Sequence, residues 1–378
     1  LINDYTVESG NLIMPDRATG SLVTVRSKDG SLTAVVEEPG NNGLLTINKE
    51  GQARFTPFPR QDYSLPDTII DEAQDKLQAS GGATRSGPYV IDMLIGYSRS
   101  AVDAVGGNAY ANALAQVESV NLALRNSRVD NVSLALVGVQ VVDRNYPITG
   151  ETLGALQNIF AEGMRDFQPD LLYGVFSGDP GDTAVGWAYV SGRAAIGYAY
   201  GEAFRHEVGH NAGGNHCYQF GGRYKHGFNN GKTSTAQCGN ESPYYSTPAV
   251  KDQHGLAIGN IVSADMARVW RENAERMSSY THFEPKAPGS FTFTSSSFGS
   301  VAFRWLQSPR AVKYEVMGKD NLLQPYKKLG ESSNTEIVLH NVANASMPYY
   351  AVAVFADGSK SGPSNIAYAK PYEGAAKK

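Results

Sequence analysis

The sequence predicts a three-part protein whose centre is an α/β domain, flanked by a β-rich N-terminal segment and a C-terminal β-sandwich. Its 378 residues exceed what one hydrophobic core usually sustains, so several domains are expected. From Tyr89 onward, predicted strands alternate with predicted helices, which is typical of a sheet covered by helices. After Pro288 the pattern changes to short strands separated by turn residues. We place the three parts at residues 1–87, 88–284 and 285–378.

The N-terminal segment has the pattern of a β meander. Residues 21–38 and 44–58 are rich in β-forming residues and are interrupted by turn signals such as Asp29-Gly30. A helix is expected over residues 68–80. Residues 81–88 are small, polar and flexible in character, and they mark the first domain boundary.

The central part predicts an alternation of strands and helices. Its strands are recognised by continuous apolar runs, and its helices by apolar residues that recur every three or four positions. We expect strands at 89–98, 132–142 and 170–176, and helices at 102–124, 150–164 and 264–280. Residues 186–201 are rich in glycine and aromatic residues and fit a strand at a sheet edge beside a cleft, with an exposed hairpin as the alternative.

The C-terminal part predicts about seven short strands in some ninety residues, which favours a β-sandwich with Trp305 and Tyr314 in its core. The segment from Phe303 to Pro309 and the turn residues Ser361 to Ser364 resemble a fibronectin type III module. This resemblance implies contact with substrate, matrix, carbohydrate or a surface, or a role as a spacer.

Charge and composition exclude some classes of partner. The net charge is -4 and the pI is near 6.0, so no basic field favours nucleic acid. The chain contains no apolar run of about 18 residues that would span a membrane. It also opens without a basic, apolar leader, so we expect any export signal to have been removed.

The two cysteines, Cys217 and Cys238, predict one disulfide and an oxidising compartment, with two free buried thiols as the alternative.

The most specific signal for function lies between Phe204 and His216. His206 and His210 are four residues apart, so on a helix both imidazoles face the same ion. Gly213 permits a sharp turn that brings His216 back to that ion. Three neutral imidazoles suit one catalytic Zn²⁺ and leave a coordination position open. Glu207 is then placed to act as general base in hydrolysis by a zinc-activated water.

The segment matches H-E-x-x-H-x-x-G-x-x-H, so residues of about 88–283 resemble the metzincin zinc metallopeptidases, in particular bacterial reprolysin-like members. The order of elements before the motif is similar as well. The resemblance implies an α/β (α+β) catalytic domain with a twisted mixed sheet and an active-site helix. It also implies a less regular lower subdomain after Gly213, with a substrate cleft between the two subdomains.

Two positions depart from that family. Residues 243–248 match its conserved turn region, but Thr235 stands where a methionine below the zinc is expected. Cys217 follows His216 where the family usually has aspartate. If Cys217 pairs with Cys238, the disulfide ties the third ligand to the turn and compensates for the missing methionine.

Other residues near the motif have weaker claims to a role. Tyr218, Tyr244 and Tyr245 are candidates for a cleft wall or for stabilising the oxyanion, with packing as the alternative for each. For His226, Glu202 and Arg205, surface roles are the default expectation.

The β-rich segment before a metzincin-like domain resembles a propeptide, with a permanent accessory domain as the alternative. No cysteine occurs in residues 1–216, so a thiolate cannot block the metal. If the chain is a zymogen, a carboxylate such as Asp62, Asp67 or Asp71, or steric occupation of the cleft, must serve.

The sequence therefore predicts a secreted, extracellular zinc metalloendopeptidase of bacterial type that acts on proteins or peptides, and the resemblance to a propeptide predicts that it is made as a zymogen. Two alternatives stay open: a purely structural zinc site, and a catalytically silent adhesion or matrix-binding protein whose C-terminal module contacts a surface.

Overall fold

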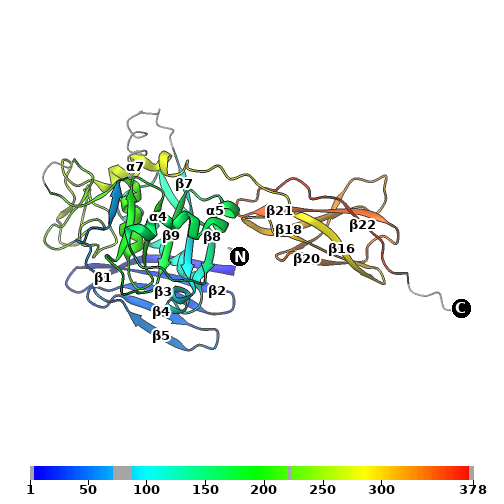
Figure 1. The fold of residues 1–378 in the computed structure, drawn as a ribbon, viewed down its shortest axis with the longest axis horizontal. Coiled ribbons are helices and arrows are strands. Elements are labelled where there is room, and N and C mark those ends of the chain that lie inside the picture. Colours follow the sequence, from blue (N-terminus) through cyan, green and yellow to red (C-terminus); the bar gives the residue numbers. More distant parts are fainter. Residues whose placement is uncertain (1–3, 71–86, 220–222, 374–378) are drawn as a thin grey trace. The chain divides into compact units, whose positions relative to one another are not determined.

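The computed structural model describes residues 4–70, 87–219 and 223–373, which form two compact units (Figure 1). One unit covers Tyr5–His282, and the other consists of Asp4 and the chain from Phe283 onward. The first unit contains the N-terminal sheet, a mixed sheet and the six helices that lie within the described residues. The second unit contains only strands.

The N-terminal sheet is an antiparallel meander whose strands pair in sequence order, as predicted. Its inner face buries Val23, Val25, Val35 and Leu44, which belong to the same hydrophobic core as the central part of the chain. The five strands are β1 (Tyr5–Ile13), β2 (Thr19–Ser27), β3 (Leu32–Glu37), β4 (Gly43–Ile47) and β5 (Ala53–Pro57).

The central sheet has six strands in the order β6-β10-β11-β9-β7-β8. All neighbouring pairs are parallel except β10 with β11, which form an antiparallel hairpin. The region at 186–201 therefore lies near a sheet edge as expected, and β6 is the outermost strand beside it. The strands are β6 (Thr68–Ile70), β7 (Tyr89–Ser98), β8 (Val132–Val142), β9 (Leu171–Phe176), β10 (Gly186–Val190) and β11 (Ala194–Tyr198).

The predicted helices are present but interrupted. Gly106 and Gly107 both have positive φ, which ends the first helix before the next begins. The helix expected at 150–164 likewise divides at Phe160. The helices are α2 (Arg99–Ala104), α3 (Ala109–Asn126), α4 (Gly150–Ile159), α5 (Ala161–Phe167), α6 (Ala203–Ala212) and α7 (Met266–Met277).

Helix α3 joins the two sheets of the larger unit. It packs against β8 of the mixed sheet and against β1, β2 and β3 of the N-terminal sheet. Its alanine-rich sequence allows both contacts, because small side chains let strands approach on two sides. Helix α6 packs on β10, β11 and α7. The N-terminal sheet thus completes the same core that holds α6.

Between α6 and α7 the chain is mostly irregular, with four short strands paired in twos. These are β12 (Asn215–Cys217) with β13 (His226–Gly227), and β14 (Thr247–Lys251) with β15 (Ala257–Ile258).

The second unit is a β-sandwich of seven strands, as predicted, in sheets of three and four strands. Trp305 and Tyr314 are buried in its core beside Phe291, Phe303 and Tyr349. This arrangement is fibronectin type III-like. The strands are β16 (Gly289–Ser297), β17 (Ser300–Leu306), β18 (Ala311–Gly318), β19 (Lys327–Ser332), β20 (Glu336–His340), β21 (Met347–Phe355) and β22 (Ala367–Ala369).

The predicted fold class, an α/β (α+β) metzincin domain with added β parts, is wrong. Strands hold about 40% of the described residues and helices 18%, in several separate sheets. The strand–helix alternation between Tyr89 and Phe176 predicts the mixed sheet and its helices, but it describes only part of this unit. In the structure, the antiparallel sheet β1–β5 shares the core of that region, and the chain between α6 and α7 contains short strands.

The helix predicted over residues 68–80 is also corrected where it is described. Thr68–Ile70 form β6, which pairs in parallel with Ala188–Val190 of β10. Two isoleucines after a threonine favour a strand when a sheet edge is available. The rest of that prediction lies outside the described residues.

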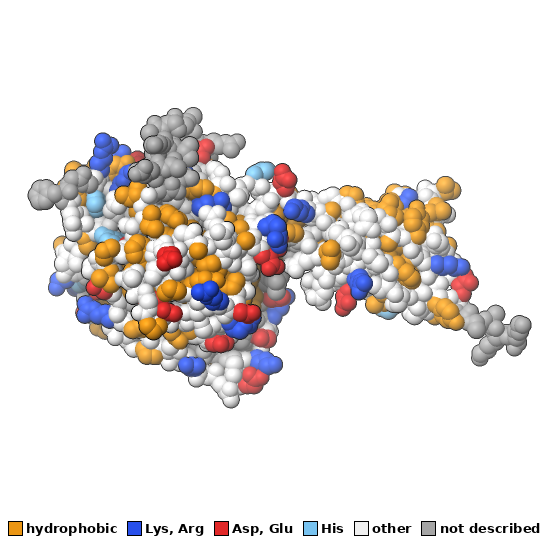
Figure 2. Space-filling model, viewed as in Figure 1, with side chains coloured by type: hydrophobic (Ala, Val, Ile, Leu, Met, Phe, Trp, Pro, Cys, Tyr) orange, Lys and Arg blue, Asp and Glu red, His pale blue; other side chains and the backbone are white. Residues whose placement is uncertain are grey.

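The surface has no obvious segregation of charge on the face drawn in Figure 2, where basic and acidic side chains are interspersed. Among the described residues, none of the helices combines the length and apolar character that a bilayer span requires.

Candidate metal centre

Helix α6 places the first two histidines of the motif in the core, where both are fully buried. The Nδ1 atom of His206 lies 2.7 Å from the backbone oxygen of Ala236, and that of His210 lies 2.7 Å from the oxygen of Gly214. A carbonyl oxygen only accepts hydrogen bonds, so Nδ1 carries the proton in each ring. Both Nε2 atoms are therefore left as acceptors that face the same point.

The end of α6 explains how the third histidine returns to that point. Gly213 has a φ of +117°, a conformation that residues with a Cβ rarely adopt. The following residue, Gly214, donates its N–H to the oxygen of Gly209 and closes the turn. The chain then enters β12 and carries His216 back across the end of the helix, as the spacing predicts.

The three Nε2 atoms converge closely. The Nε2 of His206 lies 3.0 Å from that of His210 and 3.3 Å from that of His216. Tetrahedral zinc with Zn–N distances of about 2.0–2.1 Å would separate its nitrogens by roughly 3.3 Å. Acceptors repel one another at this spacing unless a cation lies between them. The donor set and its spacing thus fit a metal ion.

Asp67 supplies a fourth ligand atom to the same group. Its carboxylate lies 3.1 Å from Nε2 of His206, 3.0 Å from that of His216 and 3.7 Å from that of His210. The four side chains form a group able to hold a metal ion, and all but His216 are fully buried.

Glu207 is buried next to this group without a partner. Neither of its carboxylate oxygens has a hydrogen-bond partner among the described residues. A Cβ atom at Gly186 of β10 would lie 2.3 Å from Glu207 Oε1, so a larger residue there would displace the carboxylate. Burial, and then the charge of Asp67, raise the pKa of Glu207 well above its usual value. A buried carboxyl without a partner is costly to keep, and groups of this kind are concentrated at functional sites.

The turn that contains Thr235 is held against the histidines by backbone, hydroxyl and amide groups. Thr235 is fully buried, and its hydroxyl accepts from the N–H of Phe228 at 2.8 Å, so it fixes the turn itself. The next residue, Ala236, offers its oxygen to His206. Gln237 then donates from Nε2 to the backbone oxygen of His206 at 2.8 Å and packs against Gly209. The turn therefore holds α6 by hydrogen bonds.

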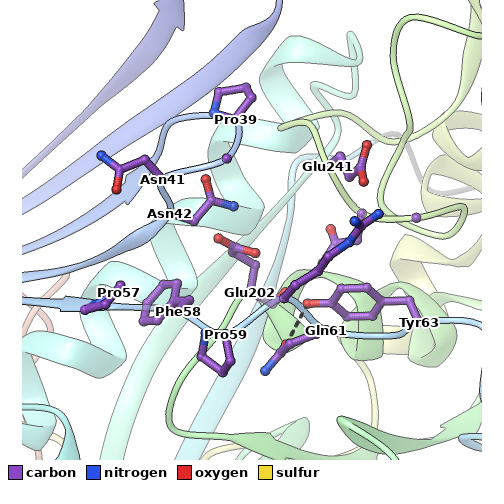
Figure 3. A pocket seen from close by; sticks show the side chains of 14 residues that line it. Pro39, Asn41, Asn42, Pro57, Phe58, Pro59, Gln61, Tyr63, Glu202 and Glu241 are labelled. Atoms are coloured by element: carbon purple, nitrogen blue, oxygen red, sulfur yellow. Dashed lines mark hydrogen bonds between the residues drawn. The ribbon is translucent and has the colours of Figure 1, made fainter.

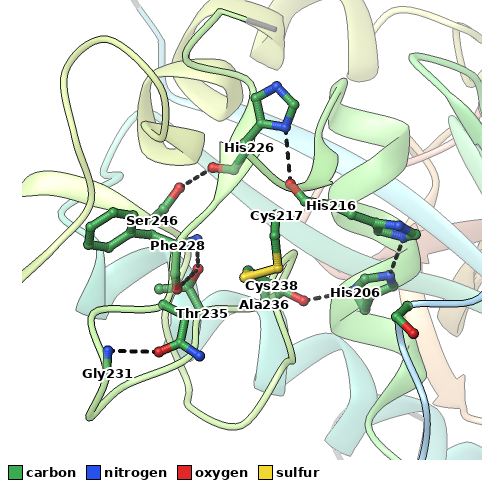
Figure 4. The surroundings of a disulfide bond; sticks show 12 residues. His206, His216, Cys217, His226, Phe228, Gly231, Thr235, Ala236, Cys238 and Ser246 are labelled. Carbon is green, nitrogen blue, oxygen red and sulfur yellow. Dashed lines mark hydrogen bonds between the residues drawn. A yellow bond between two sulfur atoms is a disulfide. The ribbon is translucent and has the colours of Figure 1, made fainter. Parts of the chain in front are cut away.

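The predicted disulfide is confirmed and joins the third histidine to this turn (Figure 4). Cys217 directly follows His216, and Cys238 lies two residues after Ala236. The bond thus connects the two segments that position His206 and His216. Its effect on metal affinity stays a prediction.

The three candidate tyrosines lie in different surroundings. Tyr245 is fully buried, donates to the oxygen of Arg205 at 2.8 Å and packs on Trp270. Tyr244 is also buried. Tyr218 is 45% exposed, and its ring stands perpendicular to that of His226 at 5.3 Å. Of the three, only Tyr218 has a side chain free to reach a ligand near the metal group.

Arg205, expected at the surface, is instead buried against the N-terminal sheet. Its guanidinium bonds to both carboxylate oxygens of Glu37, at 2.6 and 3.1 Å, and to Asn240 at 2.9 Å. Both charged side chains are almost inaccessible to solvent. Glu202 lies close by, and burial followed by the charge of Glu37 raises its pKa to about 8. The N-terminal sheet thus forms a buried ion pair with Arg205, the residue directly before His206.

A cavity of about 490 Å³ lies beside this ion pair, between the β3–β4 turn and the start of α6 (Figure 3). Asn42, Gln61, Tyr63 and Glu202 surround it, with Tyr63 donating to Gln61 at 2.9 Å. Its walls come from both the N-terminal sheet and the α6 region, so the contact between them is not completely packed.

The three carboxylates that could keep the chain latent differ in their positions. Asp67 lies among the histidines, whereas Asp62 is exposed and accepts from Ser64 within a local turn. Asp71 lies outside the described residues.

Sequence reasoning missed Glu37 and Ala236 as residues that support the centre. The first is separated from Arg205 by 168 residues, and the second acts through its backbone, so neither leaves a signal in one sequence.

No protein-family model matches the chain, and no curated protein sequence matches it. Among solved structures, "Structure of a chaperone-substrate complex" aligns with 68% of this chain at 24% identity and a TM-score of 0.47. The chain spans about 40% of the length of that structure's chain. The fibronectin type-III domain of human fibronectin type III domain containing protein 3 aligns with 26% of this chain at 16% identity and a TM-score of 0.22. The structure titled "Crystal Structure of FN3tt" aligns with 25% of this chain at 18% identity and a TM-score of 0.22.

Proposed function

We propose that this chain is the latent form of a secreted zinc-dependent endopeptidase. His206, His210 and His216 would hold the ion, Glu207 would act as general base, and Asp67 would fill the coordination position that a substrate needs. The observation that carries the proposal is the convergence of three Nε2 acceptors beside an unpartnered, buried glutamate. The motif shared with metzincin peptidases supports it, although the predicted metzincin fold class was not found.

A bound ion and the residues of the chain would carry out different parts of the reaction. A bound zinc ion would supply a Lewis acid that polarises the scissile carbonyl. Glu207 would take a proton from the attacking water and give it to the leaving amine. A cation beside Glu207 favours its ionised form, which counteracts the effect of burial on its pKa. The hydrogen bonds from His206 and His210 to backbone oxygens keep their rings oriented during the reaction.

The segment around Asp67 occupies the place where a peptide would lie. The N–H of Ala188 on β10 donates to the oxygen of Asp67 at 2.8 Å, and β6 continues along that strand. An extended peptide binds best by adding a strand to an available sheet edge. Because β6 already covers this edge, both the metal group and the peptide-binding edge are closed in this form of the chain.

We also propose an extracellular location and protein partners for this chain. A disulfide next to a ligand suits an extracellular protein, since reducing compartments would break it. Protein or peptide substrates follow from the reaction. The sandwich after Phe283 is a compact unit of its own, and we propose that it contacts matrix or a surface.

The test is proteolysis of gelatin or casein by full-length variants loaded with zinc. We define the unlatched variant as Asp67→Ala combined with Ile69→Pro, which removes the fourth ligand and interrupts β6. We expect about one zinc per chain in the wild type with little turnover, and strong turnover in the unlatched variant.

The matched control adds Glu207→Gln to the unlatched variant. It should keep its zinc and lose activity by roughly a factor of a hundred or more, because the general base is gone. Zinc that is bound without turnover in the unlatched variant would instead support a structural zinc site or the silent matrix-binding protein. Turnover that survives Glu207→Gln would contradict the assigned role of this residue.

A further inference from the structure

A second, smaller cavity of about 250 Å³ lies directly beside the metal group. His210 and His216 form part of its wall, so any side chain in it would lie close to the reacting bond. Thr68, the residue that follows Asp67, also lines it. Since the segment around Asp67 occupies the proposed peptide site, this cavity lies where a substrate residue near the scissile bond would place its side chain. The remaining polar walls come from Asn215, Gln219 and His226.

The ring of His226 is fixed in this wall. Its residue pairs with Asn215 in the short sheet β12–β13, and its backbone oxygen accepts from Ser246 Oγ at 2.6 Å. The Nδ1 atom lies 3.1 Å from the backbone oxygen of His216, the third ligand (Figure 4). Tyr218 packs perpendicular to the ring. His226 thus has one orientation, set by the same segment that carries the metal ligand.

The other ring nitrogen of His226 has nothing to bind. His226 is only 7% exposed. Its Nε2 atom is buried and lacks a hydrogen-bond partner among the described residues. Because Nδ1 donates to a carbonyl oxygen, Nε2 of the neutral ring is an acceptor. A buried acceptor without a donor is unusual in folded proteins and points to a missing partner.

The lining residues also define the charge of that partner. None of those that line this cavity in the described part of the chain is Asp, Glu, Lys or Arg. Beside the bound ion a cationic substrate side chain would be repelled and a carboxylate would compete for the ion, so both are unfavourable. A neutral side chain with an N–H or O–H donor would satisfy Nε2 and also meet the amides of Asn215 and Gln219.

We infer that this cavity selects substrates with a neutral, hydrogen-bond-donating side chain next to the cleaved bond, such as Gln, Asn, Ser or Thr. His226 recognises this side chain by accepting its hydrogen bond at Nε2. This inference rests on the proposed endopeptidase function. It names the preferred class of substrate, which the motif itself does not determine.

The experiment uses the zinc-loaded, full-length unlatched variant and a mixed peptide library whose products are sequenced by mass spectrometry. We expect enrichment of Gln, Asn, Ser or Thr at one position beside the cleaved bond. Two peptides that differ only there, with Gln or with Met of similar length, are then compared. We expect kcat/KM to favour Gln by about tenfold, because Met leaves Nε2 unpaired.

His226→Leu in the unlatched variant should abolish this preference while zinc content stays at one per chain. His226→Gln keeps an acceptor in the same wall and should retain much of it. His254→Leu, a histidine outside the cavity, serves as the matched control and should leave the Gln-to-Met ratio unchanged.

Cleavage without the predicted enrichment, or a Gln-to-Met ratio that is unchanged in His226→Leu, would overturn the inference and leave the proposed function standing. The absence of any cleavage by the zinc-loaded unlatched variant would overturn both.

Discussion

The N-terminal sheet β1–β5 and the C-terminal sandwich β16–β22 are both antiparallel β structures, yet they relate differently to the rest of the chain. The sheet packs on α3, and its valines and Leu44 belong to the core of the unit that contains the candidate metal centre. The sandwich buries its aromatic residues in a core of its own and forms a separate compact unit. Similar strand patterns in the sequence therefore describe one integrated part and one independent part.

Buried charge shows the difference most clearly. Glu37, at the end of β3, pairs with Arg205 where almost no solvent reaches either side chain. In the sandwich, the pair of Lys313 and Glu331 is 37% and 47% exposed. A buried ion pair makes removal of either partner costly, whereas an exposed pair contributes little. The N-terminal sheet is thus bound to the α6 region by an interaction that cleavage of the chain alone would not break.

The largest expected effect tests whether the sandwich is independent. Phe303 is 1% exposed and stacks on Phe291 at 4.8 Å, so Phe303→Ala should destabilise the sandwich by about 3–5 kcal/mol. Hydrogen exchange followed by mass spectrometry should show faster exchange after Phe283 only. A parallel loss of protection or of zinc in Tyr5–His282 would show that the two units are coupled.

The next effect tests whether the N-terminal sheet is integrated. Glu37→Ala leaves the Arg205 charge buried, and we expect a loss of about 3 kcal/mol. The loss should be at the lower end of the usual range, because Glu202 lies near enough to ionise and replace part of the missing charge. Urea unfolding of the Tyr5–His282 unit, followed by tryptophan fluorescence, measures it. A change below about 1 kcal/mol would mean that the buried pair does not hold the sheet in place.

A smaller effect concerns pH at the same contact. The pKa of Glu202 is raised from 4.5 to about 8, by burial first and then by Glu37. Between these values the folded chain keeps a proton that the unfolded chain has released, so this residue lowers stability as pH rises through that window. Glu202→Gln should remove that decrease. Glu241→Gln, in the same cavity, is the control and should keep the wild-type slope. Equal slopes in all three proteins would refute the assignment.

The smallest effect is expected for the exposed pair in the sandwich. Glu331→Ala should change stability by less than about 1 kcal/mol, because both partners remain solvated. Thermal unfolding at low and high salt checks this value. A loss as large as that of Glu37→Ala would remove the distinction between the two regions.

Sequence reasoning predicted the elements whose signals are local. The convergence of His206, His210 and His216 and the glycine turn follow from neighbouring residues, and the Cys217–Cys238 bond follows from a sequence with two cysteines. The strand positions of both β parts were likewise predicted from alternation and turn residues.

Properties that depend on distant residues were not predictable in the same way. The fold class failed because the packing of β1–β5 on α3 depends on apolar faces far apart in the chain. Three aspartates were equal candidates for latency until the fold brought Asp67 to the histidines. The burial of His226 and Arg205 depends on partners that no local pattern reveals.

The central claim is that three histidines and Asp67 together hold one metal ion in this form of the chain. The most direct measurement is the visible absorption spectrum of the full-length protein after stoichiometric Co²⁺ is added in place of zinc. We predict one ion per chain with the intense bands of four-coordinate Co²⁺, a changed spectrum in Asp67→Ala, and no binding in His206→Ala/His210→Ala. A wild-type chain that binds no Co²⁺, or a spectrum that Asp67→Ala leaves unchanged, would contradict the account.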